Sequence, residues 1–364
     1  MRVRCALYVE VTEEADLPAL DWAALPQPVL VMGGGSNLLF TRDFPGTVLH
    51  VAVNGISPLG RNDKTVPVRS AIPGTSSVIP GTSSVISSDP SSVIPSEVEE
   101  SPVLVTCGAG VVFDDFCAWA ASEGLWGPEN LSLIPGEVGA SAVQNIGAYG
   151  VEAKDIIAAI RAYDRTTGRL VTIDPADCAY GYRASKFKTE WKGRYVITAV
   201  TYRLSRTPQP RLDYGGVRKA LEESGTSPLR PGDIREAIIG IRRKKLPAVE
   251  ELGSAGSFFC NPVISREHFQ RIVATARADN GPDYQVPHYE VGDCIKVPAA
   301  WMIEQCGFKG ARSGGAQVYQ KQSLVIVNAS GTASPEDIIG LEQQIIKTIE
   351  QKYGITLHPE VEHV

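Results

Sequence analysis

Residues 134–152 read IPGEVGASAVQNIGAYGVE, and we expect the fold to be organised around this stretch. Its glycines permit positive φ angles and let backbone N–H groups approach a ligand closely, as an anion-binding loop requires. Gln144 and Asn145, in its middle, offer donors and acceptors to a planar heteroaromatic ring without adding charge. Taken alone, a stretch of this kind is more often a tight connection between strands than a ligand site.

A second glycine-rich stretch lies upstream. Residues 29–40 read VLVMGGGSNLLF, so a β-branched apolar run leads into the loop GGGSN at 33–37. Loops of this type bind phosphate groups through their backbone N–H groups. Two such loops in one half of the chain favour a dinucleotide cofactor.

The two loops together resemble one enzyme family. GGGSN followed by IPGxxGAxxxQNIGAYGxE is similar to the pattern of the UDP-N-acetylenolpyruvoylglucosamine reductases. This family, also called UDP-N-acetylmuramate dehydrogenase or MurB, consists of flavoenzymes of bacterial cell-wall synthesis. The similarity continues in YRASKFK (182–188), GSFFCNP (256–262) and HPEV (358–361), so it spans nearly the whole chain.

The resemblance implies an α+β fold. A two-part FAD-binding domain of the PCMH type, itself α+β, should precede a smaller α/β substrate-binding domain. The implied boundaries are 1–60 and 61–246 for the two FAD-binding subdomains, 247–357 for the substrate-binding domain, and 358–364 for a C-terminal segment with a catalytic glutamate.

The resemblance also implies the reaction. NADPH reduces FAD, and the enolpyruvyl ether of UDP-N-acetylglucosamine then receives the hydride and becomes UDP-N-acetylmuramate, a peptidoglycan precursor. The first loop has no His or Cys beside residues 33–37, where related oxidases attach FAD, so we expect FAD to be held non-covalently. The residues implied to bind it are Gly33, Gly34, Gly35, Ser36, Asn37, Pro135, Gly136, Gly139, Ala140, Gln144, Asn145, Gly147, Ala148 and Tyr149.

Three residues are implied to carry the chemistry. Hydride transfer leaves carbanion character beside the substrate carboxylate, and a fixed cation and a hydrogen-bonding acid should stabilise it. Arg183 and Glu360 match these roles, and Ser257 matches the serine that protonates the carbon. The residues implied to bind the UDP-sugar are Tyr214, Arg242, Lys245, Asn261 and Gln322. Cys260 stands where relatives often carry a basic residue.

Two alternatives stay open. One is a flavin oxidase with the same cofactor-binding fold, and the other is a catalytically silent protein that binds a nucleotide sugar. The joint presence of Arg183, Ser257 and Glu360 speaks against the silent protein.

Composition narrows the class of protein. The 364 residues suffice for two or three domains, and the formal charge of −6 argues against binding nucleic acid or anionic membranes. No apolar run approaches the length of a membrane span. Seven cysteines without regular spacing indicate reduced thiols in a cytoplasmic protein and predict no metal site. We expect a monomer whose partners are NADPH and the UDP-sugar.

A repeat interrupts the resemblance. IPGTSSV occurs at 72–78 and again at 79–85, within a Ser- and Pro-rich segment at 71–101. Such a segment cannot bury enough apolar surface to offset its ordering entropy. We therefore predict a disordered surface insertion; a lid over the site is the alternative.

Local patterns predict individual elements. β-Branched runs predict strands at 5–11, 28–32 and 46–53 near the start of the chain, and at 161–167, 169–173 and 195–204 later on. Helical spacing over 112–124 predicts a buried stripe of Val112, Phe116, Trp119 and Ala120.

The C-terminal part alternates helices with strands. Helices are predicted at 266–278, 299–308 and 334–354. Ser334 should cap the last of these with Asp337 as its capping-box partner, and Gly354 should end it. Its buried stripe should be Ile338, Leu341, Ile345 and Ile349. The basic run IRRKKLP at 241–247 reads as the solvated end of another helix.

Overall fold

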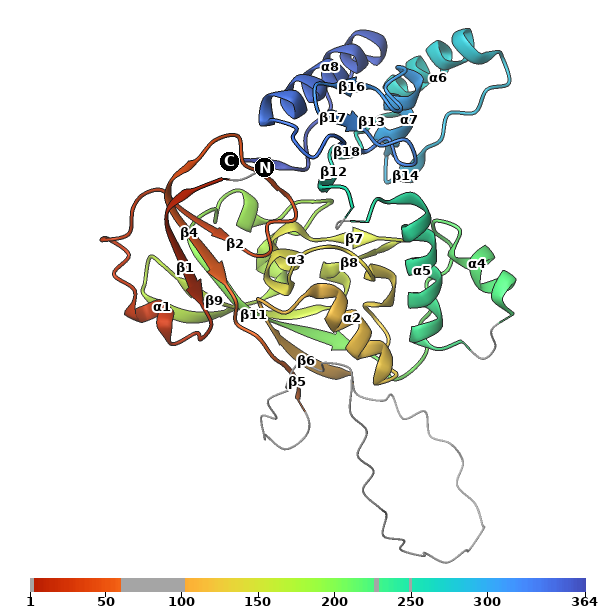
Figure 1. The fold of residues 1–364 in the computed structure, drawn as a ribbon. Coiled ribbons are helices and arrows are strands. Elements are labelled where there is room, and N and C mark those ends of the chain that lie inside the picture. The colour runs from red at the N-terminus through yellow and green to blue at the C-terminus, as the bar shows by residue number, and fades with distance from the viewer. Residues whose placement is uncertain (1–2, 60–101, 226–228, 249–250) are drawn as a thin grey trace, which may run out of the picture.

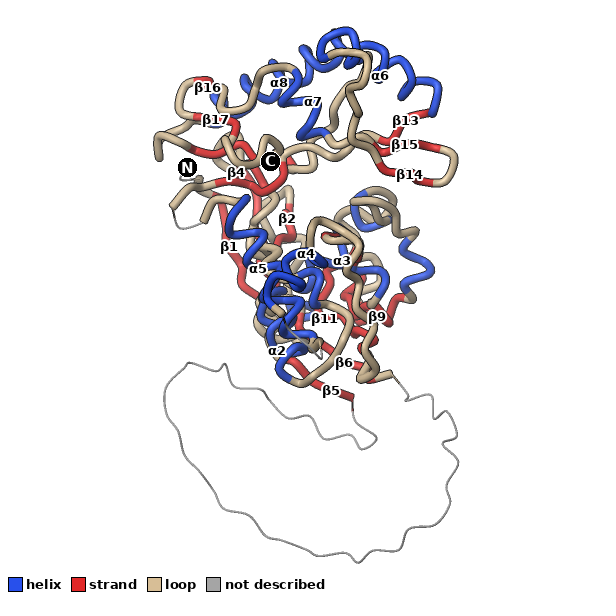
Figure 2. The backbone as a smooth tube through the Cα atoms, turned by 90° about the vertical axis from the view of Figure 1, so that its right-hand side faces the viewer, coloured by secondary structure: helices blue, strands red, loops and turns tan. Residues whose placement is uncertain are grey.

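The computed structural model describes residues 3–59, 102–225, 229–248 and 251–364. The repeat segment at 71–101 lies outside the described residues. Two subdomains pack together, and a C-terminal domain sits above them (Figures 1 and 2). Both chain ends lie where the first subdomain meets the C-terminal domain (Figure 1).

The first subdomain is a small parallel sheet in the order β1-β4-β2. Strand β4 pairs with both β1 and β2, and the chain passes from β1 to β2 through the short helix α1. Leu17, Leu49 and Val51 are buried between this sheet and the next subdomain. The strand predictions for this part of the chain are confirmed. The elements are β1 (Cys5–Val11), α1 (Asp16–Ala19), β2 (Val29–Met32), β3 (Leu38–Leu39) and β4 (Phe44–Val51).

The second subdomain is an antiparallel sheet in the order β10-β9-β11-β6-β5. Strands β10 and β11 confirm the prediction, whereas β9 runs over 157–164 rather than the predicted 161–167, because 165–168 form the turn into β10. Helices pack against the sheet to form the main core. The strands are β5 (Ile56–Leu59), β6 (Val103–Gly108), β9 (Ile157–Asp164), β10 (Arg169–Ile173) and β11 (Tyr195–Leu204), with a small hairpin of β7 (Gly147–Ala148) and β8 (Val151–Glu152). The helices are α2 (Phe113–Ser122), α3 (Val138–Gln144), α4 (Val217–Ser224) and α5 (Pro231–Lys245), with 3₁₀ turns η1 (Glu129–Leu131), η2 (Ala153–Asp155), η3 (Pro175–Cys178) and η4 (Lys186–Lys188).

Helix α2 corrects one part of the predicted stripe. Val112 is 47% exposed, because it is the N-cap residue and precedes the first helical turn. Phe113 and Cys117 are buried beside Phe116 and Ala120. Phe116 stacks on Tyr202 of β11 at 4.5 Å between ring centroids, which fixes α2 on the sheet.

The organising stretch contains a helix that the sequence did not predict. Residues 138–144 form α3, which Asn145 ends with a left-handed backbone at φ 47°. A carboxamide residue adopts this conformation more readily than a branched one. The chain then turns directly into the β7–β8 hairpin. The stretch is therefore a helix and a hairpin rather than a plain connection.

The C-terminal domain has antiparallel sheets on one side and helices on the other. The order is β12-β18-β17-β16 in one sheet and β13-β15-β14 in the other. Helices α6 and α8 lie on the outer side, away from the two subdomains (Figures 1 and 2). The strands are β12 (Ser254–Ser257), β13 (Val263–Ser265), β14 (Tyr289–Val291), β15 (Cys294–Lys296), β16 (Arg312–Ser313), β17 (Ala316–Val318) and β18 (Val325–Asn328). The helices are α6 (Arg266–Asn280), α7 (Ala299–Gln305) and α8 (Pro335–Tyr353).

Helix α8 confirms its predicted ends and buried face. The Ser334 hydroxyl accepts from the Asp337 N–H at 3.2 Å, and the Asp337 carboxylate accepts from the Ser334 N–H at 3.0 Å. Gly354 ends the helix in the left-handed region. The four residues of the predicted stripe are all buried. Local sequence therefore determined this element completely.

The C-terminal strand returns to the first subdomain. Strand β19 (Glu362–His363) pairs in parallel with β3. Thr41 donates both its N–H and its hydroxyl to the Val364 carbonyl, each at 2.9 Å. The last residues of the chain thus join the C-terminal domain to the subdomain in which the chain begins.

The pairing of β5 with β6 allows a direct test of whether the repeat segment contributes to stability. Leu59 is the Cα partner of Leu104, so the chain enters and leaves at neighbouring points of the sheet. Replacing residues 71–101 with a short Gly/Ser turn should leave the free energy of unfolding unchanged or raise it by about 1 kcal/mol, because the loop to be closed is shorter. Urea unfolding measures this, and a scrambled segment of equal length is the control. A clear loss of stability in both variants would mean that the repeat packs on the core.

Candidate active site

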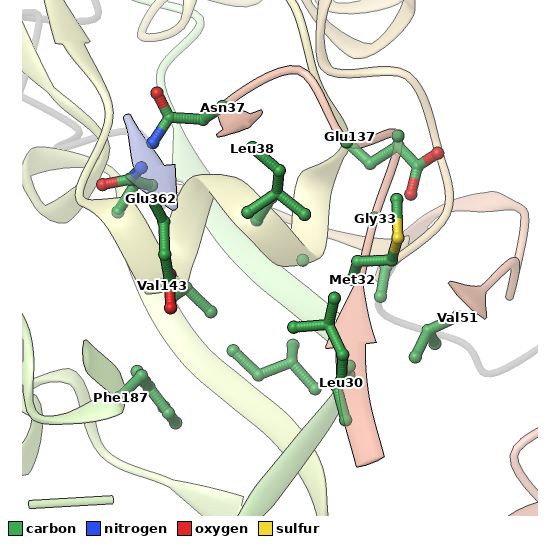
Figure 3. Close-up of a pocket in the computed structure, with 18 of the residues that line it drawn as sticks. Leu30, Met32, Gly33, Asn37, Leu38, Val51, Glu137, Val143, Phe187 and Glu362 are labelled. Atoms are coloured by element: carbon green, nitrogen blue, oxygen red, sulfur yellow. The ribbon is translucent and has the colours of Figure 1, made fainter. Parts of the chain in front are cut away.

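A cavity lies between the first subdomain and the second. Strand β2 and the loop after it form one side, and α3 and Phe187 form the other, with Asn37 and Glu362 at one end (Figure 3). Of the residues predicted to bind a cofactor, those that line it are Gly33, Gly34, Gly35, Ser36, Asn37, Gly139, Ala140 and Gln144. Pro135, Gly136, Asn145, Gly147, Ala148 and Tyr149 belong to the same stretch but are not among the lining residues.

Close packing surrounds two glycines of this cavity. A Cβ atom at Gly139 would lie 2.9 Å from the Ala109 Cβ, so only glycine lets α3 pack against the end of β6. A Cβ at Gly33 would lie 2.8 Å from a carboxylate oxygen of Glu137. The two glycine-rich loops, about a hundred residues apart in the chain, therefore meet at one place.

Glu137 is a residue of this site that the sequence did not single out. Its carboxylate lies beside Gly33 (Figure 3) and 3.1 Å from His50 Nε2 on β4. The other ring nitrogen, His50 Nδ1, lies 3.2 Å from Glu10 on β1. Burial raises the pKa of Glu137, and the hydrogen bond from His50 opposes that rise. No sequence pattern links His50 to Glu137, because parallel pairing alone brings β4 beside the loop.

Asn145 does not face the cavity with its carboxamide. The side chain is buried, and its amide nitrogen donates to the Gly181 carbonyl at 2.8 Å and to Glu152 at 3.1 Å. Its oxygen accepts from the Lys154 N–H at 3.0 Å. These bonds hold the hairpin after α3 in place. The contact with a cofactor ring expected from the sequence is therefore not supported for this residue.

Arg183 and Glu360 meet beside the cavity. Arg183 Nε lies 2.8 Å from Glu360 Oε1, and its Nη2 donates to the Gly147 carbonyl at 2.6 Å. Arg183 has φ 54°, an uncommon conformation for a long side chain. Such strain persists only where the surroundings impose it, and it concentrates at functional sites. Burial raises the pKa of Glu360, and the positive charges of Arg183 and Lys188 oppose the rise.

Backbone contacts fix the position of Glu360. Its N–H donates to the Phe258 carbonyl at 2.8 Å, and its carbonyl accepts from the side-chain amide of Asn37 at 2.9 Å. The Asn37 carbonyl in turn accepts from the Glu362 N–H at 3.0 Å. Asn37, which was predicted to bind cofactor, thus also ties the first glycine-rich loop to the C-terminal segment. Ser257 ends β12 one residue before Phe258, and its side chain is exposed.

Aromatic side chains gather around the next part of the site. Tyr214 stacks on Tyr289 at 5.3 Å between ring centroids. The Lys296 ammonium lies 4.9 Å from the Tyr182 ring and 5.7 Å from the Tyr289 ring. Burial lowers the pKa of Lys296 and raises that of Tyr214. The sequence identified Tyr214 alone among these; Tyr182 lies within the YRASKFK motif, but Tyr289 and Lys296 carried no signal.

Asn261 occupies the same region. Its amide nitrogen donates to the Tyr182 hydroxyl at 3.3 Å, and its oxygen accepts from the Ala299 N–H at 2.9 Å. Cys260, one residue earlier, is partly buried, and its thiol pKa is raised by burial and by the nearby Glu360. Its N–H donates to the His358 carbonyl at 3.0 Å. Cys260 therefore lies beside the segment that carries Glu360.

The remaining residues predicted to bind substrate differ in their exposure and in their contacts. Lys245 is exposed at the end of α5, as the solvated helix end predicts. Arg242, one turn earlier, lies beside the Tyr149 hydroxyl, and burial lowers the pKa of the Arg242 guanidinium. The Gln322 side-chain oxygen accepts from the Leu324 N–H at 3.3 Å.

Comparison with known proteins gives a consistent result. The C-terminal domain of UDP-N-acetylenolpyruvoylglucosamine reductase matches residues 247–364, and an FAD binding domain matches residues 91–174. A UDP-N-acetylenolpyruvoylglucosamine reductase of Bacteroides fragilis is 39% identical over 365 residues, which cover 100% of this chain and 95% of that protein. The enzyme of that name from Chromobacterium violaceum is 40% identical over 364 residues, covering 99% of this chain and 94% of its own.

The chain belongs to the UDP-N-acetylenolpyruvoylglucosamine reductase family.

The crystal structure of a family member from Thermus caldophilus shares the fold. It has a TM-score of 0.57 at 20% sequence identity and covers 98% of this chain and 91% of its own. The predicted α+β fold, with an FAD-binding part followed by the C-terminal domain of this family, is confirmed.

The cavity fits the FAD that the family implies. Gly33, Gly34 and Gly35 line the cavity, the walls from Leu30 and Val143 are apolar, and Gln144 and Lys188 supply polar groups. Apolar walls with a few placed polar groups are typical of cofactor sites. In the described residues, no cluster of three or more His, Cys, Asp or Glu side chains could hold a metal ion. Within the described ranges, no helix has both the length and the apolar character of a membrane span.

Proposed function

We propose that this protein reduces the enolpyruvyl ether of UDP-N-acetylglucosamine to UDP-N-acetylmuramate in peptidoglycan precursor synthesis, with FAD as cofactor and NADPH as hydride donor. Family membership supports the reaction as a whole. The observation that carries it to this site is the Arg183–Glu360 ion pair, which lies beside the cavity lined by the two glycine-rich loops. The flavin chemistry supplied there is two hydride transfers, from NADPH and then to the enolpyruvyl methylene carbon.

Arg183 and Glu360 are placed to stabilise the charge that this reaction creates. Hydride addition leaves negative charge on the neighbouring carbon, delocalised into the substrate carboxylate. Arg183 supplies a fixed cation whose orientation is set by the Gly147 carbonyl. Glu360 supplies a carboxyl group whose raised pKa favours the protonated, hydrogen-bond-donating form. Groups oriented in advance in a largely buried site stabilise developing charge more than water does.

Ser257 is our proposed proton donor. Ser257 is the last residue of β12 and is exposed. The carbonyl of the next residue, Phe258, accepts the hydrogen bond that positions Glu360. The Glu360 backbone is therefore hydrogen-bonded to the residue that follows Ser257. A hydroxyl is a weak acid, but a carbanion is far more basic, so positioning can supply most of the effect.

One assay distinguishes this function from its alternatives. The purified protein should oxidise NADPH rapidly only when the enolpyruvyl ether of UDP-N-acetylglucosamine is supplied, and UDP-N-acetylmuramate should form in equal amount. An oxidase would consume NADPH or another donor with O₂ and without this substrate. A silent binding protein would retain the UDP-sugar without turnover. Either of those outcomes would overturn the proposal.

Tyr214 and Lys245 are proposed to hold the UDP-sugar rather than to take part in the chemistry. Tyr214 lies in an aromatic pair with Tyr289, and Lys245 is an exposed cation after which the helix ends. Tyr214→Phe and Lys245→Ala should therefore raise the substrate KM with little change in kcat, as loss of ground-state binding does. Lys244→Ala, a neighbouring exposed cation, is the control. Equal falls in kcat and kcat/KM at constant KM would instead place either residue in the transition state.

We further propose that the enzyme is monomeric and cytoplasmic and holds FAD non-covalently. All seven cysteines are free thiols, which supports a reducing compartment. His50, the histidine beside the first loop, has Glu137, Glu10 and Tyr8 at its ring nitrogens. That arrangement supports a structural role for the ring rather than a covalent bond to FAD.

A further inference from the structure

Two lysines line the cofactor cavity, and they differ in how their charge is balanced. Lys192 forms an ion pair with Glu362, and its side chain is 64% exposed. Lys188 is partly buried and donates to two neutral oxygens, the Gln144 side-chain oxygen at 2.8 Å and the Arg183 carbonyl at 3.1 Å. Among the residues that the structure describes, no carboxylate lies within ion-pairing distance of Lys188.

The charge of Lys188 is therefore available to a ligand. Lys188 lowers the pKa of Glu360, but that carboxyl group already has Arg183 at 2.8 Å. Withdrawing an ammonium group from water is costly unless an anion compensates it. Neutral carbonyl oxygens satisfy its hydrogen bonds without neutralising its charge. A cation held in this way beside a cavity is prepared for negative charge that arrives with the ligand.

The neighbours of Lys188 indicate which part of the cofactor it meets. It holds the carboxamide of Gln144, at the end of α3, and the backbone of Arg183, whose guanidinium pairs with Glu360. These are the groups proposed to surround the reacting end of FAD. The glycine-rich loop at 33–37, which suits the diphosphate, forms a different side of the cavity. Lys188 thus belongs to the end where the flavin ring reacts.

We propose that Lys188 stabilises the negative charge that the flavin ring acquires on reduction, and so raises the reduction potential of bound FAD. Hydride transfer from NADPH adds two electrons and one proton to the ring and releases NADP⁺. The ring therefore gains one negative charge, and a cation beside it favours the reduced form. This inference rests on the proposed identity of the cofactor. It assigns Lys188 a role separate from that of Arg183, which faces charge on the substrate.

The two lysines supply a matched experiment. The two-electron potential of bound FAD is measured by equilibration with a reference dye in the parent protein and in Lys188→Met, Lys188→Arg and Lys192→Met. Lys188→Met should lower the ratio of reduced to oxidised FAD at a fixed potential by about 10- to 100-fold, which is about 30–60 mV. Lys188→Arg keeps the charge and should stay close to the parent. Lys192→Met should shift the potential much less, because the Lys192 side chain is 64% exposed and water and salt screen its charge.

Cofactor affinity separates this role from simple phosphate binding. If Lys188 met the diphosphate instead, Lys188→Met would weaken binding of oxidised and reduced FAD equally, and thermodynamic linkage would leave the potential unchanged. Titration of the apoprotein with oxidised FAD measures the affinity for the oxidised cofactor. An unchanged potential in Lys188→Met, or an equal shift in Lys192→Met, would overturn the proposal. If Lys188→Met fails to retain FAD, Lys188→Gln, which keeps a polar group for Gln144, takes its place.

The measurement does not require turnover of the UDP-sugar. A protein that failed to reduce the enolpyruvyl ether would refute the proposed function, yet the potential shift could still be measured on its bound FAD. Conversely, normal turnover with an unshifted potential in Lys188→Met would refute this inference alone.

Sulfite adds at the flavin N5 and places negative charge on the ring. Its binding should therefore weaken in Lys188→Met and recover in Lys188→Arg.

Discussion

Replacing Ser257 with alanine is expected to slow reoxidation of the reduced flavin by the enolpyruvyl substrate by about 10²–10⁴-fold or more, the loss typical of a missing general acid. In the described part of the chain, the Ser257 hydroxyl has no hydrogen-bond partner and is exposed at the end of β12. It is thus free to donate to a substrate carbon. In the proposed reaction NADPH reduces the flavin before the UDP-sugar enters, so Ser257→Ala should still bleach the flavin at close to the parental rate.

Rapid-mixing absorbance of the flavin band measures the two half-reactions separately. Ser257→Cys should recover part of the loss, because a thiol is a stronger acid in a similar position. Ser254→Ala, on the same strand, is the matched control and should leave both half-reactions unchanged. If Ser257→Ala lost reduction by NADPH but kept rapid reoxidation, Ser257 would not be the proton donor.

Replacing Glu360 with alanine should reduce the rate of the second half-reaction by about 10²–10³-fold, as removal of a group that stabilises developing charge does. The buried carboxyl lies 2.8 Å from Arg183, so its loss also leaves that cation without its partner. Glu360→Gln should retain more activity than Glu360→Ala, because the amide is a permanent hydrogen-bond donor. Glu336→Gln, which changes an exposed carboxylate in the first turn of α8, is the control.

The pH dependence of Glu360 has a defined sign. Burial raises its pKa, so the protonated form persists to higher pH than for an ordinary glutamate, although Arg183 and Lys188 limit the rise. If the protonated carboxyl is the active form, the rate of the second half-reaction should fall as pH rises through this pKa. Glu360→Gln cannot lose a proton and should lack that fall. A Glu360→Gln profile that kept the alkaline fall of the parent would show that another group titrates there.

Several elements could be predicted from local sequence. Helix α8 carries its cap, its capping-box partner and its terminal glycine within one continuous stretch, and all of them lie as expected. The strands β1, β2 and β11 are short β-branched runs and were equally readable. One error concerned a boundary: Val112 fits the helical stripe but precedes the first turn of α2, and it is therefore exposed. Helix α3 was not predicted at all, because its small residues and glycine carry no apolar periodicity.

The site was only partly visible in the sequence. The glycine loops, Arg183 and Glu360 lie in recognisable motifs, and the structure brings them together. Asn145 lies in such a motif too, but its carboxamide is engaged within the protein by three hydrogen bonds. A motif identifies a residue and its neighbours in the chain. It does not say to which side a carboxamide turns.

The sequence by itself determined the two glycine-rich loops that line the cavity and the motifs by which the chain resembles its family, because a loop or a motif is a property of a short continuous stretch. The α+β class followed from that resemblance. Tertiary structure alone decided which charges are paired. His50 reaches Glu137 only because β4 lies beside β2, and Glu360 reaches Arg183 only because the C-terminal strand returns to β3. Lys188 and Lys192 read alike in sequence. They differ because Glu362, brought from the far end of the chain, neutralises one of them and leaves the other to the cofactor cavity.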